Sequence, residues 1–229
     1  MGEQKILRFT FDGQLFLTKK KGIKMLSRKI RELFSGIIAL SLILIWSPTA
    51  SGGIPTDQVK EKADEIIRIL NDPAFKDRKA ERKKLIINVI EQMVDWDEIA
   101  RRALGRYWKE RNLEEREEFK ELFKDLLEKS YSDKLELYGG EKIKYQGEKI
   151  DGNYAIVRTK VVNNQKNIDV SVDFHLIRKG ERWLIYDLSI EGVRAVNNYR
   201  VQFNEVITSS SYEELVKKLK SKLGEAKTR

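Results

Sequence analysis

The sequence predicts an α+β fold in which helices cover a curved antiparallel sheet of about four strands. Apolar residues recur at helical spacing from residue 56 to residue 135 and again after residue 193. Between residues 142 and 190 they alternate with polar residues instead, as in half-buried strands. Short turns separate these strands, and short turns favour antiparallel hairpins. No repeat or low-complexity stretch divides residues 52–229, which we interpret as a single domain.

Three helices are expected in the first part of this domain. Thr56 can cap the first of them, and Asn71-Asp72-Pro73 would end it. A second helix is expected over about residues 78–93. Asp95 begins a short third helix, and Gly105 is placed to end it because glycine readily adopts the conformation of a helix C-cap.

A long fourth helix and two later ones complete the helical prediction. Asn112 and Glu115 form a capping box for the helix over residues 113–135, whose wide apolar face suits cover over a sheet. After the sheet, a helix is expected over about residues 193–207. A second Ser-x-x-Glu capping box at 211–214 opens the terminal helix.

The expected strands cover residues 142–149, 154–162, 168–178 and 183–190. Apolar and polar residues alternate along the third, which gives one apolar and one wet face. Asp187 interrupts the last strand, where both faces look apolar. A buried carboxylate needs a partner, and the candidates are Arg194 and Arg200 in the following helix, in a structural role.

The first part of the chain has the pattern of an export signal. Residues 25–51 place basic residues before an apolar run of 14 residues, from Leu33 to Trp46, which is shorter than a membrane-spanning helix. Small residues follow, so we expect cleavage near Ser51 and export. Residues 1–24 fit neither a signal nor a domain, and we interpret them as a non-native upstream extension before a start at Met25.

Composition excludes several kinds of chemistry. The 229 residues include no cysteine and one histidine, which excludes disulfide scaffolds, thiolate catalysis, cysteine-ligated zinc and a lipoprotein anchor. The 45 Lys and Arg against 36 Asp and Glu give a net charge of +9. Nine of these basic residues and three acidic ones precede Gly52, so the remaining domain is nearly balanced and does not favour a nucleic-acid partner.

The remaining polar motifs favour structural roles. His175 lies on the polar face of its strand with Asp169 and Asp173, as a surface or second-layer residue. The run 106–109 resembles a stacking platform, which an exported protein seldom uses. The remaining candidate feature is extensive apolar surface on the predicted helices and strands. Its periodicity is equally compatible with a filled core and with a cone that holds an apolar ligand.

Three segments resemble the MlaC family, also called toluene-tolerance proteins. They are VDWDEIARRALGRYW (94–108), LEEREEFKELFKDLLEKSYSDKLELYGGEKIKY (113–145) and RWLIYDLSIEGVRAVNNYRVQF (182–203). The resemblance runs in order from about Asp57 to Leu223. It departs at residues 111–113, which read Arg-Asn-Leu where the family often has Thr-Pro, so a partner contact at that corner is not carried over.

The resemblance implies a soluble periplasmic phospholipid carrier of a Gram-negative-type bacterium. Such a carrier holds acyl chains in an apolar pocket between helices and sheet. It shuttles glycerophospholipid between an outer-membrane lipoprotein–porin complex and an inner-membrane ABC transporter with an MCE-domain subunit, and so maintains outer-membrane lipid asymmetry. The resemblance implies no catalysis, no cofactor besides the lipid cargo and no nucleic-acid partner, and we expect a monomer.

The expected lipid-binding residues combine the family's motifs with an inward position in this sequence. They are Leu104, Tyr107, Phe123, Leu127 and Tyr131 on helices, Val157, Val170, Val172 and Phe174 on strands, and Val193, Tyr199 and Phe203 on the returning helix. Two other hypotheses remain open. One is a solid-core periplasmic adaptor without a lipid ligand. The other is an enzyme of the nuclear-transport-factor-like class with Asp187 or Asp173 as its acid or base.

Overall fold

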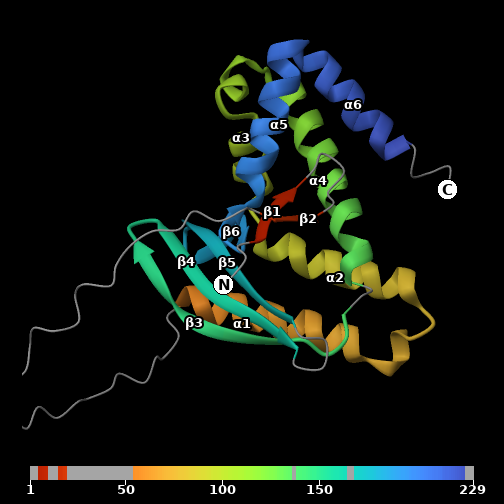
Figure 1. The fold of residues 1–229 in the computed structure, drawn as a ribbon, viewed down its shortest axis with the longest axis vertical. Helices are drawn as coiled ribbons and strands as arrows, with labels where there is room; N and C mark the ends of the chain where they lie inside the picture. Colours follow the sequence, from red (N-terminus) through yellow and green to blue (C-terminus); the bar gives the residue numbers. More distant parts are fainter. Residues whose placement is uncertain (1–4, 10–14, 20–53, 136–137, 164–167, 225–229) are drawn as a thin grey trace, which may run out of the picture.

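The structure, a computed structural model, describes residues 5–9, 15–19, 54–135, 138–163 and 168–224 (Figure 1). The side chains of residues 5–9, 15–19, 54, 131–135 and 168 are not part of this description. The expected export signal and the cleavage position near Ser51 lie outside the described residues. Within residues 1–24, β1 (Lys5–Phe9) and β2 (Leu15–Lys19) pair as an antiparallel hairpin that forms a sheet of its own.

The main sheet confirms the predicted antiparallel architecture. Its strands follow chain order, each hydrogen-bonded to the next: β3 (Lys142–Asp151), β4 (Tyr154–Asn163), β5 (Ile168–Lys179), β6 (Arg182–Ile190) and β7 (Val193–Arg194). The fifth strand is a correction, since a helix was expected to begin at Val193. Glu191 and Gly192 both have positive φ and reverse the chain, so that Val193 pairs with Ile190 and α5 begins only at Ala195.

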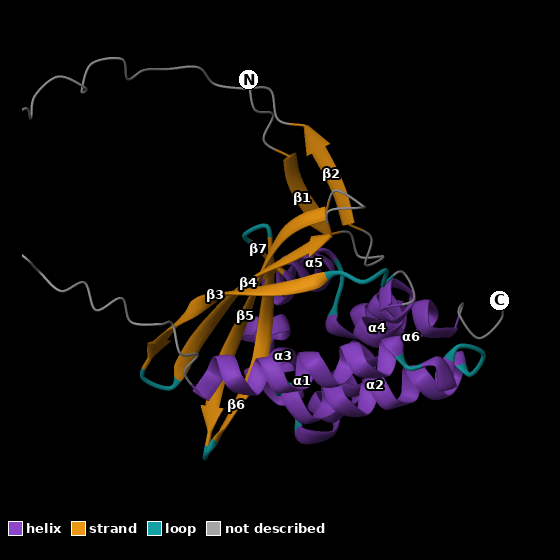
Figure 2. Cartoon of the chain, turned by 90° about the horizontal axis from the view of Figure 1, so that it is seen from below, coloured by secondary structure: helices purple, strands orange, loops and turns teal. Residues whose placement is uncertain are grey.

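The described residues also form six α-helices and two short 3₁₀ segments. They are α1 (Ile54–Asn71), η1 (Pro73–Phe75), α2 (Lys79–Met93), α3 (Trp96–Leu104), η2 (Gly105–Glu110), α4 (Leu113–Leu135), α5 (Ala195–Ser209) and α6 (Tyr212–Gly224). Helix α1 packs against β3, β4 and α2, while α3 to α6 pack on one another, and Figure 2 shows α1 and α2 side by side. None of the helices in the described segments is both long and apolar enough to cross a membrane.

Local capping explains where several helices begin. Asp95 accepts a hydrogen bond from the Glu98 amide and caps α3, as predicted. Asn112 and Glu115 exchange the two hydrogen bonds of a capping box at the start of α4, at 2.8 and 2.9 Å. Thr56 was expected to cap α1 but lies inside its first turn. Its amide and hydroxyl both donate to the Glu148 carboxylate on β3, so a distant strand supplies the acceptor that satisfies this helix end.

The register of the sheet determines which side chains share a face. Val157 of β4 pairs with Phe174 of β5, and Val161 pairs with Val170. Directly opposed residues lie on the same face, so these side chains share the face on which Val157 packs against Val59 of α1. The register shifts at His175 in β5, where one extra residue of β6 is accommodated.

Asp187 ties β6 to the start of α5. The residue is 3% exposed. One carboxylate oxygen accepts from the amides of Leu188 and Val196, and the other accepts from Arg194 Nε at 2.9 Å. Arg194, rather than Arg200, is therefore the predicted structural partner. The carboxylate also replaces the side-chain cap that α5 lacks at its own N-cap position.

Replacing Asp187 with Ala is expected to lower the free energy of unfolding by about 3 kcal/mol, because it leaves a half-buried arginine and a helix-terminal amide without their acceptor. Urea denaturation would measure the loss. Asp169→Ala is the matched control. Asp169 is exposed and pairs with Lys160 at 2.9 Å, and an exposed pair of this kind contributes less than about 1 kcal/mol. Equal losses in the two variants would contradict the structural role of Asp187.

Candidate functional site

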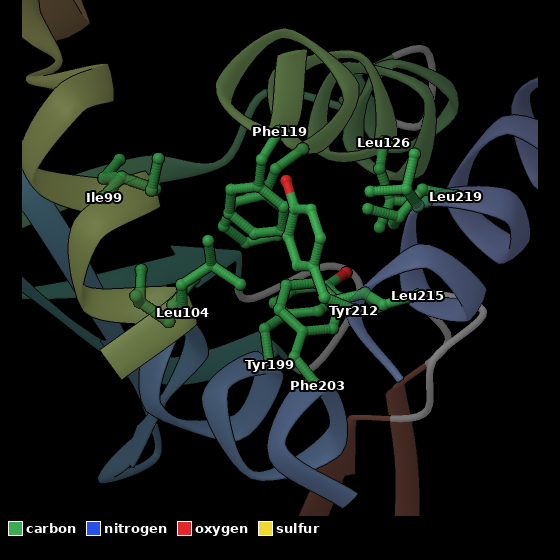
Figure 3. Packing of buried hydrophobic residues seen from close by; sticks show 14 residues of the cluster. Ile99, Leu104, Phe119, Leu126, Tyr199, Phe203, Tyr212, Leu215 and Leu219 are labelled. Atoms are coloured by element: carbon green, nitrogen blue, oxygen red, sulfur yellow. The ribbon is translucent and has the colours of Figure 1, made fainter. Parts of the chain in front are cut away.

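The buried apolar residues form two separate clusters. The helical cluster joins α3, α4, α5 and α6, and its aromatic rings interlock (Figure 3). Phe123 contacts Tyr199 and Phe203 edge to face, with ring centroids 5.1 and 5.2 Å apart. The sheet cluster joins Val59 of α1 to β4, β5 and β6. The fold therefore holds two cores, and half-buried Val94 packs against both of them.

The expected site residues on helices fall mostly inside the helical cluster. Leu104, Phe123, Tyr199 and Phe203 are all nearly or fully buried there, and Leu127 packs half-buried against them. Tyr107 lies apart from this cluster on η2, where its hydroxyl pairs with Thr208 and accepts from Arg106. Tyr131 belongs to α4, but its side chain is outside the description.

The expected site residues on the sheet are less completely covered. Val157 is fully buried in the sheet cluster, and Phe174 packs half-buried against that cluster. Val170 and Val172 continue along the same face of β5 and are also half-buried. Val193 is half-buried on β7. The structure thus brings a row of incompletely covered apolar side chains together on β5.

Tyr145 of β3 is a candidate that the sequence analysis missed. Its hydroxyl oxygen is buried and finds no hydrogen-bond partner within the described residues, and its ring packs against the sheet cluster. Burial, with a smaller contribution from the Asp64 charge, raises the pKa of Tyr145 to about 12. The alternation along β3 was the only available signal, because no pattern shows that a tyrosine hydroxyl lacks a partner. A neutral, unpaired donor among apolar side chains is suited to a ligand's carbonyl or ester oxygen.

On the opposite face of the sheet, charged side chains of α3 lie next to Tyr186 of β6. Glu98 of α3 accepts two hydrogen bonds from Arg101, at 2.8 and 2.6 Å, and one from Arg102 at 2.6 Å. Arg102 in turn stacks over the Tyr186 ring at 4.0 Å. Burial opposes the charge on Glu98, but hydrogen bonds and charge from the two arginines outweigh it and lower the pKa of this carboxyl group.

His175 is more buried than the wet strand face predicted. It is 8% exposed, and its Nε2 lies 2.7 Å from Ser189 Oγ. Burial, and next the Arg194 charge, lower the pKa of His175. In the part of the chain that is described, no group of three or more metal-ligating side chains is placed to hold an ion. His175 therefore belongs to a packed second layer, one of the two positions expected for it.

Fold and site together define a class of α+β protein with an antiparallel sheet, helical cover and an incompletely covered apolar sheet face. A protein of the same fold is the phospholipid-binding protein from Ralstonia solanacearum, solved in complex with a phospholipid. Its TM-score is 0.66 at 23% sequence identity, over 76% of this chain and 98% of that one. This likeness confirms the predicted α+β fold.

Sequence comparison identifies the family. The MlaC protein family model matches residues 60–221. A curated relative from Haemophilus influenzae, the intermembrane phospholipid transport system binding protein MlaC, is 24% identical over 142 residues. That alignment covers 60% of this chain and spans 66% of the relative's length. The chain belongs to the MlaC family, which confirms the resemblance seen in the sequence.

The Glu98 cluster gives a pH-dependent prediction. Glu98→Gln is expected to lower the free energy of unfolding at about pH 7 by about 2 kcal/mol, since hydrogen bonds between charged partners are lost. The pKa of Glu98 is lowered in the folded protein, so its contribution is present above the usual value of 4.5 and disappears as the pH falls through the folded value. Urea denaturation across this range should show the difference between the two proteins narrowing with acid. A constant difference down to about pH 3 would contradict it.

Proposed function

We propose that this chain binds a glycerophospholipid and carries it between membranes, with the acyl chains against the helix-facing side of the sheet. The observation that carries the proposal is the row of half-buried apolar side chains Val170, Val172 and Phe174 on β5. An apolar side chain left partly exposed inside a layered fold costs free energy that a bound acyl chain recovers. Family membership and the names of the relatives support the same ligand class.

The twelve expected residues have different parts in this proposal. Val170, Val172, Phe174 and Val193, with Leu127 on α4, are the half-buried surface that acyl chains would contact. Leu104, Phe123, Val157, Tyr199 and Phe203 would form the packed wall behind them. Tyr107 and Tyr131 remain predicted contacts, and Tyr145 adds a donor for an ester oxygen.

The energetic role of a carrier is to replace water around the acyl chains. Each methylene group buried contributes about 0.8 kcal/mol, so an acyl chain of ordinary length costs on the order of ten kcal/mol to move through water alone. The charged headgroup would stay near solvent, because burying it unpaired is costly. No bond is made or broken, and so the proposal needs neither a catalytic residue nor a cofactor.

The family resemblance supports a cellular setting for this proposed function. We place the mature chain, as a monomer, in the periplasm of a Gram-negative-type bacterium. There it would exchange lipid with an outer-membrane lipoprotein–porin complex and an inner-membrane ABC transporter that has an MCE-domain subunit. This exchange would serve to maintain outer-membrane lipid asymmetry.

Bound lipid should be found in the purified protein. Residues 52–229 would be exported to the periplasm of a bacterial host, purified without detergent and measured by native and then denaturing mass spectrometry. The expected result is a stoichiometric adduct that resolves into glycerophospholipid. A clean apoprotein mass, unchanged after incubation with liposomes, would contradict the carrier and favour the solid-core adaptor.

A charge on the β5 surface should prevent lipid retention. Val170→Glu is expected to reduce the bound lipid at least tenfold while the protein stays folded, because a half-buried carboxylate opposes acyl chains. Mass spectrometry would report the lipid, and circular dichroism the fold. Ile150→Glu makes the same kind of change at a 50% exposed position of the same sheet and should keep its lipid. A folded Val170→Glu protein with a full lipid load would exclude this surface as the binding site.

A further inference from the structure

A hollow lies between the carboxyl end of α3, η2 and the middle of α5. Its volume is about 590 Å³, within the usual range for small-molecule sites. Helices α3 and α5 pack directly on each other (Figure 1). The hollow is lined by Arg101, Arg102, Leu104, Gly105, Arg106, Arg200, Val201 and Asn204. We call it the arginine cavity.

The charged residues that line the arginine cavity are all positive. Every charged residue among its described lining residues is an arginine. Glu98 pairs with Arg101 and Arg102 but carries one negative charge for the two. Arg200 has neither a hydrogen bond nor an ion pair within the described part of the chain, and Arg106 donates to the neutral Tyr107 hydroxyl. The cavity therefore holds an uncompensated positive charge.

Several contacts hold the guanidinium groups in place. Arg101 and Arg102 are fixed by the buried Glu98, and Arg102 also stacks on Tyr186. The stem of Arg200 lies against Gly105, where a Cβ atom would come within 3.3 Å of its Cδ. Gly105 also has a φ of +58°, which glycine adopts without strain. Arginine side chains that are already fixed before an anion binds lose less conformational freedom on binding.

We infer that the arginine cavity binds a phosphate group. Guanidinium forks match the oxygen geometry of phosphate, and Asn204 adds an amide donor. A concave site of this size favours a small anion over the flatter surface of an acidic protein. Val201, 58% exposed among the lining residues, offers an apolar contact to an attached organic group. The phosphate could belong to a lipid headgroup or be free in solution.

This site is distinct from the proposed acyl surface. Val170, Val172 and Phe174 do not line the arginine cavity, and Leu104 of the packed wall is the one expected lipid-binding residue that does. Arg102 instead stacks over Tyr186 and Tyr154, on the face of the sheet opposite the one that packs on α1. Phosphate binding therefore does not require that the chain carry lipid.

The test measures two probes on wild-type protein and on three variants. Inorganic phosphate is titrated by isothermal calorimetry, and phosphatidylcholine vesicles with and without phosphatidylglycerol are tested by co-sedimentation. Arg200→Ala is expected to weaken phosphate binding about tenfold, and Arg200→Lys by less, because lysine keeps the charge but loses the fork. Arg68→Ala on α1, an exposed arginine outside the cavity, should bind as wild type does.

The outcomes distinguish the source of the phosphate. Heat of binding with inorganic phosphate that depends on Arg200 supports a site for the free ion. Arg200-dependent binding only to vesicles with phosphatidylglycerol supports a headgroup site. Equal losses in Arg200→Ala and Arg68→Ala would show general charge attraction and overturn the inference. So would binding of polyglutamate in place of both phosphate probes, and so would no binding by a wild-type protein whose circular dichroism shows a folded chain.

Discussion

The buried carboxylate of Asp187 joins the two halves of this fold. It accepts two backbone amides and one arginine, so its burial is compensated by hydrogen bonds from both sheet and helix. Because one of those amides belongs to the first turn of α5, the direction of α5 is set by β6. The helical cluster includes Val196, Tyr199 and Phe203 of α5, so this acceptor helps to fix the position of the cluster relative to β6.

Two cores allow the molecule to be stable and also to present a surface that can bind an apolar ligand. The interlocking rings of Phe123, Tyr199 and Phe203 give the helical cluster a dense core that needs no ligand. The sheet is covered by α1 mainly along β3 and β4, so β5 keeps its apolar side chains incompletely covered. A binding surface of this kind can gain an apolar ligand without disturbing the core that holds the helices together.

Local chemistry in the sequence was enough to predict most of the fold. The capping box at Asn112, the glycine after α3 and the four hairpin strands all depend on neighbouring residues, and each is confirmed. Predictions failed where a distant element decides the outcome. Glu148 accepts the hydrogen bonds at Thr56 from 92 positions away, and pairing with β6 turns Val193 into a strand residue.

The candidate site was harder to predict than the fold. Periodicity placed Phe123 and Val172 equally inward, yet only packing between distant elements determines that one is sealed and the other half-exposed. Nothing in the sequence marks the Tyr145 hydroxyl as unpaired, because the absence of a partner among the described residues is a property of the assembled fold. The arginines of α3 and α5 are about a hundred positions apart in sequence, and only the packing of the two helices brings them to one hollow.

The outer strand β3 bears on how the protein behaves when concentrated. It is an edge strand of its sheet, and its pairing register with β4 shifts between Tyr145 and Gly147. Exposed lysines at 142, 144 and 149 line this strand. A twisted, positively charged edge strand repels the same edge strand of a second molecule. Strand-to-strand aggregation is thereby discouraged at the place where an open sheet is most exposed to it.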